Sequence, residues 1–351
     1  QCLVGSEMCI RDRYKGKARA YTNIALIKYW GKENETLILP MNNSLSLTLD
    51  AFYTETSVTF SEEYTQDRFF LDDKQQSEAA TKKISAFLDL VRAKANCPFF
   101  AQVNSRNFVP TAAGLASSAS GLAALAGACN AALDLQLSQT ELSRLARRGS
   151  GSACRSIFGG FVEWHTGDDD TSYATPIASE GWEKELSMLF ILINDKEKDV
   201  SSRDGMRRTV ETSSYYSGWL ESTPHDLKKL KQAIREKDFQ LLGETTEANA
   251  LKMHATTMAA TPPFTYWSPE SLRAMDCVRS LRQKGLACYF TMDAGPNVKV
   301  LCQRKDEEAI LTQLKKVFHP EQLIVAHAGQ GLVDLPMTVT DPSMTNEGVS
   351  K

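Results

Sequence analysis

The residues best suited to chemistry lie in four separate segments of the chain. Three of these segments are expected loops, at residues 110–121, 149–160 and 292–297, and the fourth runs from residue 23 to residue 32. Their side chains combine hydroxyls, basic groups and a carboxylate, which can bind anions or take part in proton transfer. Each segment also has a purely structural interpretation.

The segment 110–121 (PTAAGLASSASG) leads from a loop with Pro and Gly into an Ala-rich stretch of high helix propensity. Free backbone N–H groups collect at the start of a helix, and the helix dipole there favours an anion. The hydroxyls of Ser117, Ser118 and Ser120 can add hydrogen bonds to a phosphate or a ligand for magnesium. The segment is not a P-loop, because no Gly-Lys-Ser/Thr follows it. Close packing of helices is the competing interpretation.

Arg155 is the only charged residue in the segment 149–160 (GSGSACRSIFGG), which we expect to be a loop. Its planar guanidinium suits a carboxylate or a phosphate, and Ser150 and Ser152 place hydroxyls beside it. A local salt bridge is the structural alternative, and the spacing alone does not choose between the two.

Asp293 stands at the end of an apolar strand expected over residues 287–292 and directly before a turn. A carboxylate on such a rigid support is a common position for a catalytic group, although a turn-forming aspartate is the alternative. In the segment 23–32 (NIALIKYWGK), Lys28 and Lys32 lie four residues apart. These two lysines either face an anionic ligand or form the solvated end of a strand.

The elements that must position these residues alternate between strands and helices. Amphipathic helices are expected over residues 77–95 and 138–148, the second with Ser138 as N-cap and Glu141 completing a capping box. Further helices are expected over residues 201–221, 224–237, 238–253, 268–284 and 307–318. Strands are expected over residues 18–27, 45–49, 52–60, 99–103, 186–194, 287–292, 298–302 and 323–326. This order predicts an α+β chain in two lobes that join near residue 185.

Composition excludes several classes of protein. The chain has 351 residues, of which 42% are hydrophobic and 24% charged, as expected for a globular protein of about two domains. The net charge of −3 gives no reason to expect a nucleic-acid partner. No apolar run reaches the ~18 residues of a membrane helix. The eight cysteines form no CxxC pair and the five histidines form no HExxH, so we expect reduced thiols rather than a disulfide framework or a zinc site.

Both ends of the chain are expected to lie outside the fold. Residues 1–13 lack the pattern of a signal peptide, and we interpret them as a disordered or artefactual leader. Residues 337–351 are polar and without periodicity, which predicts a disordered tail. We therefore expect an N-terminal domain over residues 14–185 and a C-terminal domain over residues 186–336.

Seven motifs, taken in order, make the chain similar to the diphosphomevalonate decarboxylases of the GHMP kinase superfamily, and most of all to those of Gram-positive cocci. The resemblance runs from about residue 15 to about residue 333. The motifs are NIALIKYWGK at 23–32, LPMNNS at 39–44, PTAAGLASSAS at 110–120, GSGSACR at 149–155, VSSRDGM at 200–206, MHATT at 253–257 and YFTMDAGPNV at 289–298. Any one of them is weak, whereas the ordered set is specific.

The resemblance implies a two-lobed GHMP kinase fold, with an N-terminal lobe like ribosomal S5 domain 2 and a ferredoxin-like α/β C-terminal lobe. It implies ATP-dependent decarboxylation of (R)-5-diphosphomevalonate to isopentenyl diphosphate in the mevalonate pathway of isoprenoid biosynthesis. The 3-hydroxyl is phosphorylated first, and phosphate and carbon dioxide then leave. The implied cofactors are ATP and Mg²⁺, with magnesium bound through the ATP phosphates and no protein ligand assigned. A cytoplasmic homodimer without nucleic-acid or membrane partners is also implied.

Roles for single residues follow from the same resemblance. It implies that Asp293 takes or orients the hydroxyl proton, that Lys28 beside it favours the ionised carboxylate, and that Arg155 holds the substrate carboxylate. The residues implied in substrate binding are Asn23, Tyr29, Lys32, Ser150, Ser152 and Ser202. Those implied in nucleotide binding are Ser105, Gly114, Leu115, Ala116, Ser117, Ser118 and Ser120.

Three other functions compete with this one. The first is a GHMP mevalonate 3-kinase that does not decarboxylate, and the second is a phosphomevalonate decarboxylase that differs in its phosphate pocket. The third is a catalytically inactive nucleotide-binding relative. The presence of Asp293, Lys28 and Arg155 together argues against the kinase and the inactive relative.

Overall fold

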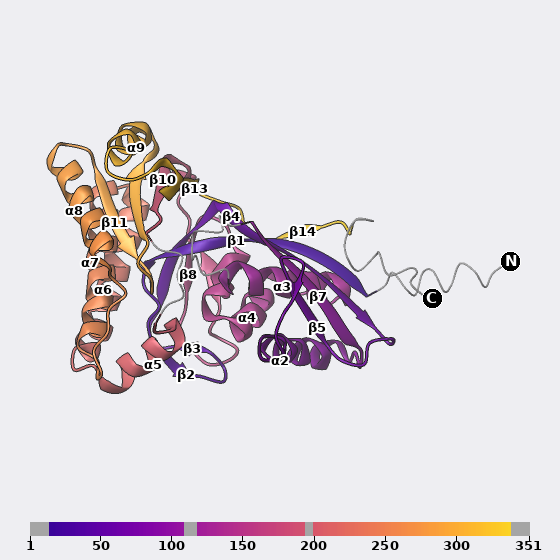
Figure 1. Cartoon of the computed structure of the whole chain (residues 1–351). Coiled ribbons are helices and arrows are strands. Elements are labelled where there is room, and N and C mark those ends of the chain that lie inside the picture. Colours follow the sequence, from indigo (N-terminus) through magenta and orange to yellow (C-terminus); the bar gives the residue numbers. More distant parts are fainter. Residues whose placement is uncertain (1–13, 109–117, 194–198, 338–351) are drawn as a thin grey trace.

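The structure, a computed structural model, describes residues 14–108, 118–193 and 199–337. In these residues the chain forms two lobes, each with its own β-sheet and its own layer of helices (Figure 1). This arrangement confirms the α+β chain in two lobes that the sequence predicts. The predictions for residues 1–13 and 338–351 lie outside the described residues.

The N-terminal lobe is built on a sheet that has eight strands in the described residues, in the order β14-β1-β4-β7-β5-β6, with β8 and β9 continuing from β4. Its strands are β1 (Lys15–Ile27), β4 (Ser44–Ser61), β5 (Arg68–Leu71), β6 (Lys74–Gln75), β7 (Phe100–Phe108), β8 (Phe161–Trp164), β9 (Ala174–Pro176) and β14 (Val333–Leu335). A separate hairpin consists of β2 (Lys32–Asn34) and β3 (Leu39–Pro40). The strands predicted separately over residues 45–49 and 52–60 form one strand, β4, because its pairing with β1 continues across a register shift near Tyr21.

Helices cover one face of this sheet, below the long strands in Figure 1. They are α2 (Glu78–Ala95), α3 (Ser118–Ala132) and α4 (Gln139–Gly149). The predicted capping box of α4 is confirmed, because Ser138 Oγ accepts from the N–H of Glu141 at 3.3 Å and the Glu141 carboxylate accepts from the N–H of Ser138 at 2.9 Å. The three helices and the sheet enclose the main core of the lobe.

The segment after α4 is not the loop that the sequence predicts. Residues 151–157 form a 3₁₀ helix, η1 (Gly151–Ile157), in which all residues but Ser152 are buried. The segment contains few helix formers, so local propensity does not predict this 3₁₀ helix. Close packing favours it instead. A Cβ at Gly151 would press against the ring of Trp164, so only glycine allows η1 to lie this close to β8.

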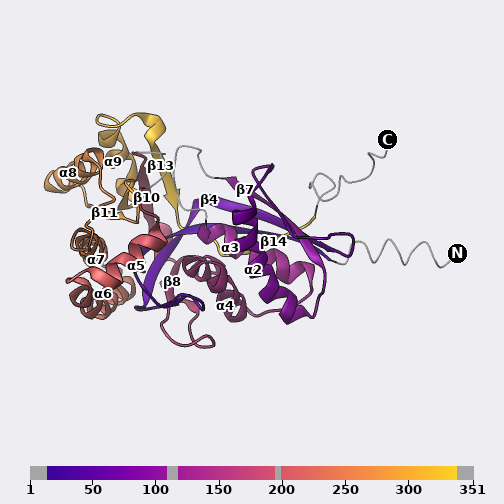
Figure 2. The same ribbon diagram turned by 60° about the horizontal axis from the view of Figure 1, so that its bottom comes forward.

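The C-terminal lobe contains a four-stranded antiparallel sheet in the order β11-β12-β10-β13. Its strands are β10 (Leu186–Ile191), β11 (Cys288–Met292), β12 (Val298–Gln303) and β13 (Leu323–His327). Its α-helices are α5 (Ser202–Thr212), α6 (Tyr216–Glu236), α7 (Phe239–Met258), α8 (Pro269–Gln283) and α9 (Glu307–Leu314), and short 3₁₀ turns are η2 (Trp182–Glu185), η3 (Arg304–Asp306) and η4 (Pro320–Gln322). Figure 2 shows α6, α7 and α8 grouped on the side of this sheet away from the N-terminal lobe's helices.

The predicted boundary between α5 and α6 is wrong. The sequence places the break before Pro224, whereas the structure ends α5 at Thr212 and carries α6 straight through Pro224. A proline inside a helix costs about 3 kcal/mol. Buried residues such as Trp219 and Leu227 lie on either side of the proline, and their packing offsets this cost.

The two lobes share a hydrophobic core. Strands β1 and β4 contribute to the same buried cluster as β10, α6 and α7, and the rings of Phe52 and Phe190 pack edge to face at 4.8 Å across the junction. The last strand, β14, returns to the N-terminal sheet and pairs with β1. The domain limits 14–185 and 186–336 therefore stay a prediction. None of the helices in the described residues combines the length and the apolar character needed to span a bilayer.

Candidate functional site

A cavity of about 870 Å³ lies between the two lobes. The N-terminal lobe lines it with β1, α2, α3 and η1, and the C-terminal lobe lines it with α5 and the turn after β11. The predicted site residues that line this cavity are Asn23, Lys28, Tyr29, Lys32, Ser105, Ser118, Ser150, Ser152, Arg155, Ser202 and Asp293. The fold thus brings together residues that are as far apart in the sequence as Asn23 and Asp293.

Asp293 is held between two lysines where the lobes meet. It directly follows β11, and its Oδ1 lies 2.8 Å from Nζ of Lys28, which directly follows β1. Its Oδ2 lies 3.0 Å from Nζ of Lys299, in β12. The lysine side chains are only 3% and 4% exposed, whereas that of Asp293 is 38% exposed and lines the cavity. The carboxylate is therefore fixed through both oxygens and still reachable by a ligand.

The ionisation of this cluster follows from burial and charge. Burial by itself would raise the pKa of Asp293, but Lys28 and Lys299 outweigh it and hold that pKa well below its usual range. Burial lowers the pKa of Lys28 to about 8, against the opposing effect of Asp293. Burial likewise lowers the pKa of the nearby His254 to about 3. At neutral pH the site holds an ionised carboxylate, a charged Lys28 and a neutral His254.

The C-terminal lobe also holds the backbone of Lys28. The N–H of Lys28 donates to Asn249 Oδ1 at 2.8 Å, and Nδ2 of the same Asn249 donates to Asp226 Oδ2 at 2.9 Å. Lys252 Nζ lies 2.8 Å from the Asp226 carboxylate. Within the N-terminal lobe, Lys28 Nζ donates to the carbonyl of Ala25 at 2.7 Å. These contacts aim the ammonium group at Asp293 from both lobes.

Arg155 is buried in η1 and aimed by side chains of the N-terminal lobe. Its Nε donates to Asn23 Oδ1 at 3.1 Å and its Nη1 donates to Ser44 Oγ at 2.5 Å. The guanidinium lies 5.9 Å from the ring centre of Trp164. Asn23 is itself fixed through its Nδ2, which donates to the Ser152 carbonyl at 3.0 Å. The local salt bridge, which the sequence leaves open as the structural alternative, is not what holds Arg155, since its hydrogen-bond partners in the described residues are neutral, and this leaves a positive charge for a ligand.

Tyr29 lines the cavity and carries a buried hydroxyl. Its hydroxyl is buried and has no hydrogen-bond partner in the described residues, and its ring packs edge to face on Trp164 at 4.7 Å. Burial raises the pKa of Tyr29, so the hydroxyl keeps its proton. A buried hydroxyl without a partner is costly unless a ligand satisfies it.

The hairpin of β2 and β3 carries Lys32 at the edge of the cavity. Lys32 Nζ lies 2.5 Å from Oε2 of Glu35, and the Glu35 side chain is 53% exposed. The backbone before it turns at Gly31 with a φ of +117°, where a Cβ would collide with the hydroxyl of Tyr216. That hydroxyl donates to the carbonyl of Trp30 at 2.8 Å, which ties the hairpin to α6.

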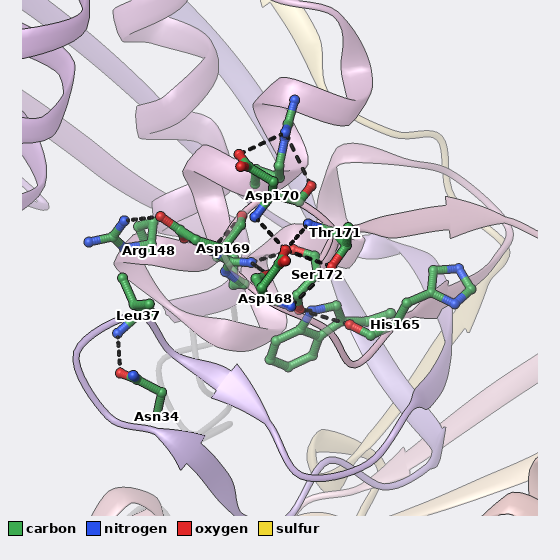
Figure 3. Close-up of polar contacts among 12 residues, drawn as sticks. Asn34, Leu37, Arg148, His165, Asp168, Asp169, Asp170, Thr171 and Ser172 are labelled. Carbon is green, nitrogen blue, oxygen red and sulfur yellow. Dashed lines mark hydrogen bonds and ion pairs between the residues drawn. The ribbon is translucent and has the colours of Figure 1, made fainter.

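The end of α4 is anchored to the loop that follows β8 (Figure 3). The buried Arg147 donates to the carbonyl of Ser172 at 2.5 Å and pairs with Asp169. Arg148 lines the cavity, and its Nη1 lies 2.9 Å from the second oxygen of Asp169. These contacts fix the chain where it leaves α4 and enters η1. The backbone of Ser150, the C-cap of α4, is therefore held rigidly.

Of the residues predicted to bind the nucleotide, only some line the cavity. Ser105 and Ser118 line the cavity, and Ser105 Oγ lies 2.8 Å from Thr56 Oγ1. Ser120 is buried, does not line the cavity, and has its Oγ 2.8 Å from Thr54 Oγ1. The predictions for Gly114, Leu115, Ala116 and Ser117 lie outside the described residues.

Apolar side chains line the part of the cavity formed by α2 and β5. They are Phe69, Leu71, Ile84, Phe87 and Leu90. A flat apolar group such as a nucleobase fits this part better than a phosphate does, because phosphate needs hydrogen-bond donors or cations. The cations concentrate instead where the two lobes meet.

The described residues offer magnesium no cluster of protein ligands. They contain no group of three or more His, Cys, Asp or Glu side chains that could hold a metal ion. Mg²⁺ is often bound by one or two protein oxygens together with substrate phosphates. The hydroxyl of Ser118, at the first residue of α3, fits such a role, whereas both oxygens of Asp293 are already paired with lysines.

Sequence reasoning missed two cations of the site. Lys299 lies within the apolar strand β12 (VKVLCQ), and a lone lysine in such a strand was the available signal. Arg203 lines the cavity next to Ser202 at the start of α5. Its signal was weaker, because an arginine near a helix start is common on protein surfaces. Neither residue can be assigned a partner without the fold.

Comparisons with known proteins agree with this geometry over both lobes. Residues 20–174 match the model of the diphosphomevalonate decarboxylase-like N-terminal domain, and residues 188–346 match that of the mevalonate 5-diphosphate decarboxylase C-terminal domain. The chain is 36% identical over 322 residues to a diphosphomevalonate decarboxylase of Candida albicans. The aligned region covers 87% of this chain and 89% of the relative.

Solved structures extend this similarity to three dimensions. Mevalonate diphosphate decarboxylase from Staphylococcus aureus has a TM-score of 0.90 and 53% identity, over 92% of this chain and 98% of that one. A structure described as MDDEF in complex with MVAPP, AMPPCP and magnesium has a TM-score of 0.90 and 65% identity, over 92% of this chain and 99% of that one. These matches confirm the two-lobed fold that the motifs imply and the closeness to proteins of Gram-positive cocci.

Proposed function

The chain belongs to the diphosphomevalonate decarboxylase family, and we propose that the residues around Asp293 are those that carry out its reaction. The reaction is the ATP-dependent decarboxylation of (R)-5-diphosphomevalonate to isopentenyl diphosphate, ADP, phosphate and carbon dioxide. The observation that carries the assignment of residues is the ionised Asp293 facing the cavity between Lys28 and Lys299, with the buried Arg155 lining the same cavity.

In the first step, Asp293 orients the 3-hydroxyl of the substrate by accepting its hydrogen bond. Because its pKa lies well below the usual range, Asp293 acts as an anionic acceptor and does not retain the proton at neutral pH. The hydroxyl oxygen bonds to the γ-phosphorus of ATP as the bond to ADP breaks, and the hydroxyl proton is released to solvent. Correct aim matters here, since a tertiary alcohol is a poor nucleophile and phosphoryl transfer depends mainly on positioning and charge stabilisation. Lys28, at 2.8 Å from Asp293, adds positive charge where the transferred phosphoryl group arrives.

In the second step, Arg155 holds the substrate carboxylate while phosphate leaves C3. Loss of phosphate develops positive charge at C3, and the anionic Asp293 stabilises this charge electrostatically. The guanidinium fork suits a carboxylate, and Asn23 and Ser44 fix its direction. Departure of carbon dioxide then leaves the electron pair of its bond to form the carbon–carbon double bond.

The diphosphate of the substrate is held by groups with donors to spare. We place it near the hydroxyl of Tyr29, with Lys32, Ser150, Ser152 and Ser202 around it. The buried Tyr29 hydroxyl lacks a partner among the described residues, and a phosphate oxygen supplies one.

ATP is placed along the rest of the cavity. Its base fits the apolar part lined by α2 and β5, and its phosphates approach the start of α3, where Ser118 supplies a donor. Magnesium bound to these phosphates neutralises charge as the phosphoryl group transfers. Ser120 is the weakest of the predicted nucleotide contacts, because Thr54 already occupies its hydroxyl.

One coupled assay tests the function. Purified protein is incubated with ATP, magnesium and either mevalonate, its 5-phosphate or its 5-diphosphate, and both ADP and carbon dioxide are measured. We expect both products in equal amounts with the diphosphate alone. ADP without carbon dioxide would identify a kinase, turnover of the monophosphate a phosphomevalonate decarboxylase, and no product a binding protein.

We also propose that the protein acts in the cytoplasm as a homodimer. The support is the family resemblance, since members usually form homodimers. Light scattering coupled to size-exclusion chromatography tests it, with an expected mass of twice 38.9 kDa. A monomer at micromolar concentration would contradict it.

A further inference from the structure

Lys299 is a buried cation in a position that suits an apolar residue. It lies in β12 between Val298 and Val300, which are both fully buried, and it is itself only 3% exposed. Strand β12 is an inner strand, flanked by β10 and β11, and Lys299 lines the cavity between the lobes. Burying a lysine is costly unless the charge is paired. A strand interior alone therefore gives no reason for a lysine here.

The two lysines that bind Asp293 come from different parts of the molecule. Lys28 reaches Asp293 from the N-terminal lobe, across the cavity between the lobes. Lys299 belongs to the hairpin of β11 and β12 whose turn begins with Asp293, and its register partner in β11 is Thr291, two residues before Asp293. The distance from Lys299 to Asp293 is thus fixed by one hairpin, whereas the distance from Lys28 depends on how the lobes sit.

We infer that Lys299 is a positioning residue that anchors Asp293 through Oδ2 and leaves Oδ1 to exchange between Lys28 and the substrate hydroxyl. The inference rests on the proposed function. With Oδ2 anchored at 3.0 Å, the carboxylate keeps its direction when Oδ1 changes partner. Without Lys299, the same exchange frees the side chain to rotate, and the hydroxyl loses its aim.

Lys299 also helps to keep Asp293 ionised. The titratable groups that face this carboxylate are Lys28 from the end of β1, Lys299 from β12, Arg155 from η1 and His254 from α7. His254 is neutral at physiological pH, so the cations alone oppose protonation of the carboxylate. Removing one of the two directly paired cations raises the pKa of Asp293, and activity that needs the ionised form is then lost at a higher pH as the pH falls.

The test compares K299M, K299R and the control K305M with the wild-type enzyme in the coupled assay. Met has a similar length and suits a strand interior, Arg keeps the charge, and Lys305 is an exposed lysine of the same lobe. We expect K299M to lower kcat about 100-fold with KM values for both substrates within about threefold, and K305M to behave as wild type. The acidic limb of the kcat/KM profile should move up by about one pH unit or more in K299M, and K299R should restore at least a tenth of kcat.

A second comparison separates positioning from general loss of structure. In a D293N background, K299M should lower the residual rate by less than about threefold, because its target is already gone. A kcat within threefold of wild type, or equal losses in both backgrounds, would overturn the inference. Circular dichroism checks folding, and K299Q replaces K299M if the latter does not fold. Wild-type enzyme that releases no carbon dioxide contradicts the proposed function, whereas active wild type with unaffected Lys299 variants contradicts this inference alone.

Discussion

The two functional regions of the cavity are built in different ways. Around Asp293, every charged group is paired with, or aimed by, buried neighbours that come from both lobes. Around the proposed diphosphate position, the Tyr29 hydroxyl has no partner in the described residues, and Lys32 is paired with the half-exposed Glu35. Arg203, which lines the same cavity from α5, is exposed.

This difference matches what each region must do. Groups that stabilise charge in a transition state act best when their orientation is fixed in advance, because no reorganisation is then needed during the reaction. Groups that bind a polyanion must instead give up their present partners, or have none, when the ligand arrives. If the comparison is right, substitutions near Asp293 act on kcat, and substitutions near Lys32 act on KM.

The strongest test of the comparison is D293N. Loss of the negative charge removes both roles proposed for Asp293, the acceptor for the hydroxyl and the stabilisation of charge at C3, so we expect kcat to fall by roughly 10³-fold or more. Binding of an ATP analogue, measured by calorimetry, should stay within about threefold, because the proposed base position lies against α2 and β5 and the proposed contact of Asp293 is the substrate hydroxyl. The control D276N removes an exposed carboxylate of α8 and should be silent. A wild-type kcat in D293N would remove Asp293 from the mechanism.

The next largest effect is expected from R155A. In the proposed mechanism Arg155 holds the carboxylate that leaves as carbon dioxide, so kcat should fall about 100-fold while KM for diphosphomevalonate rises only a few-fold. R155K should recover little, since an ammonium group does not reproduce the fork held by Asn23 and Ser44. The control R144A removes a partly exposed arginine of α4. An effect confined to KM would move Arg155 into the weakly held binding region.

A pH profile tests the state of Lys28. Because burial lowers its pKa to about 8, Lys28 is charged below this pH and loses its proton as the pH rises through it. If the charge is needed, kcat falls about tenfold between pH 7 and pH 9. In K28R the guanidinium stays charged, so this basic limb should disappear even though kcat is lower at every pH. A K28R enzyme with the same basic limb would assign the limb to another group.

Much of this site could be predicted from the sequence, and the missing part has a common physical cause. The motifs around Lys28, Arg155 and Asp293 name the residues that the fold brings to one cavity, because each motif is local. The contacts that aim them are not local. Asn249 lies 221 residues from Lys28, and nothing in its sequence neighbourhood indicates that its side chain accepts the Lys28 N–H.

The prediction of secondary structure is limited by the same cause, contacts between residues far apart in the sequence. The capped helix α4 follows from a local hydrogen-bond pattern and is predicted correctly. The helix α6 continues through Pro224 because of tertiary packing, which a reading of local propensity misses. Lys299 shows both outcomes. Its apolar strand can be predicted from the sequence, whereas its pairing with Asp293 depends on the hairpin of β11 and β12 and cannot.

The smallest predicted effect concerns Glu35, and its substitution should improve substrate binding, whereas the other substitutions reduce activity. Glu35 occupies Lys32 in the protein without ligand, so the incoming diphosphate must displace one carboxylate to reach that lysine. The Lys32 side chain is 7% exposed and that of Glu35 is 53% exposed, so solvent weakens the pair from one side, and E35Q should lower KM for diphosphomevalonate only about two- to fivefold, with kcat unchanged. The gain should shrink at high salt, because salt already screens the pair. The control E33Q removes an exposed charge from the same hairpin and tests for a general effect of charge. A higher KM in E35Q would mean that Glu35 aims Lys32 at the ligand, and the binding region would then be preorganised like the region around Asp293.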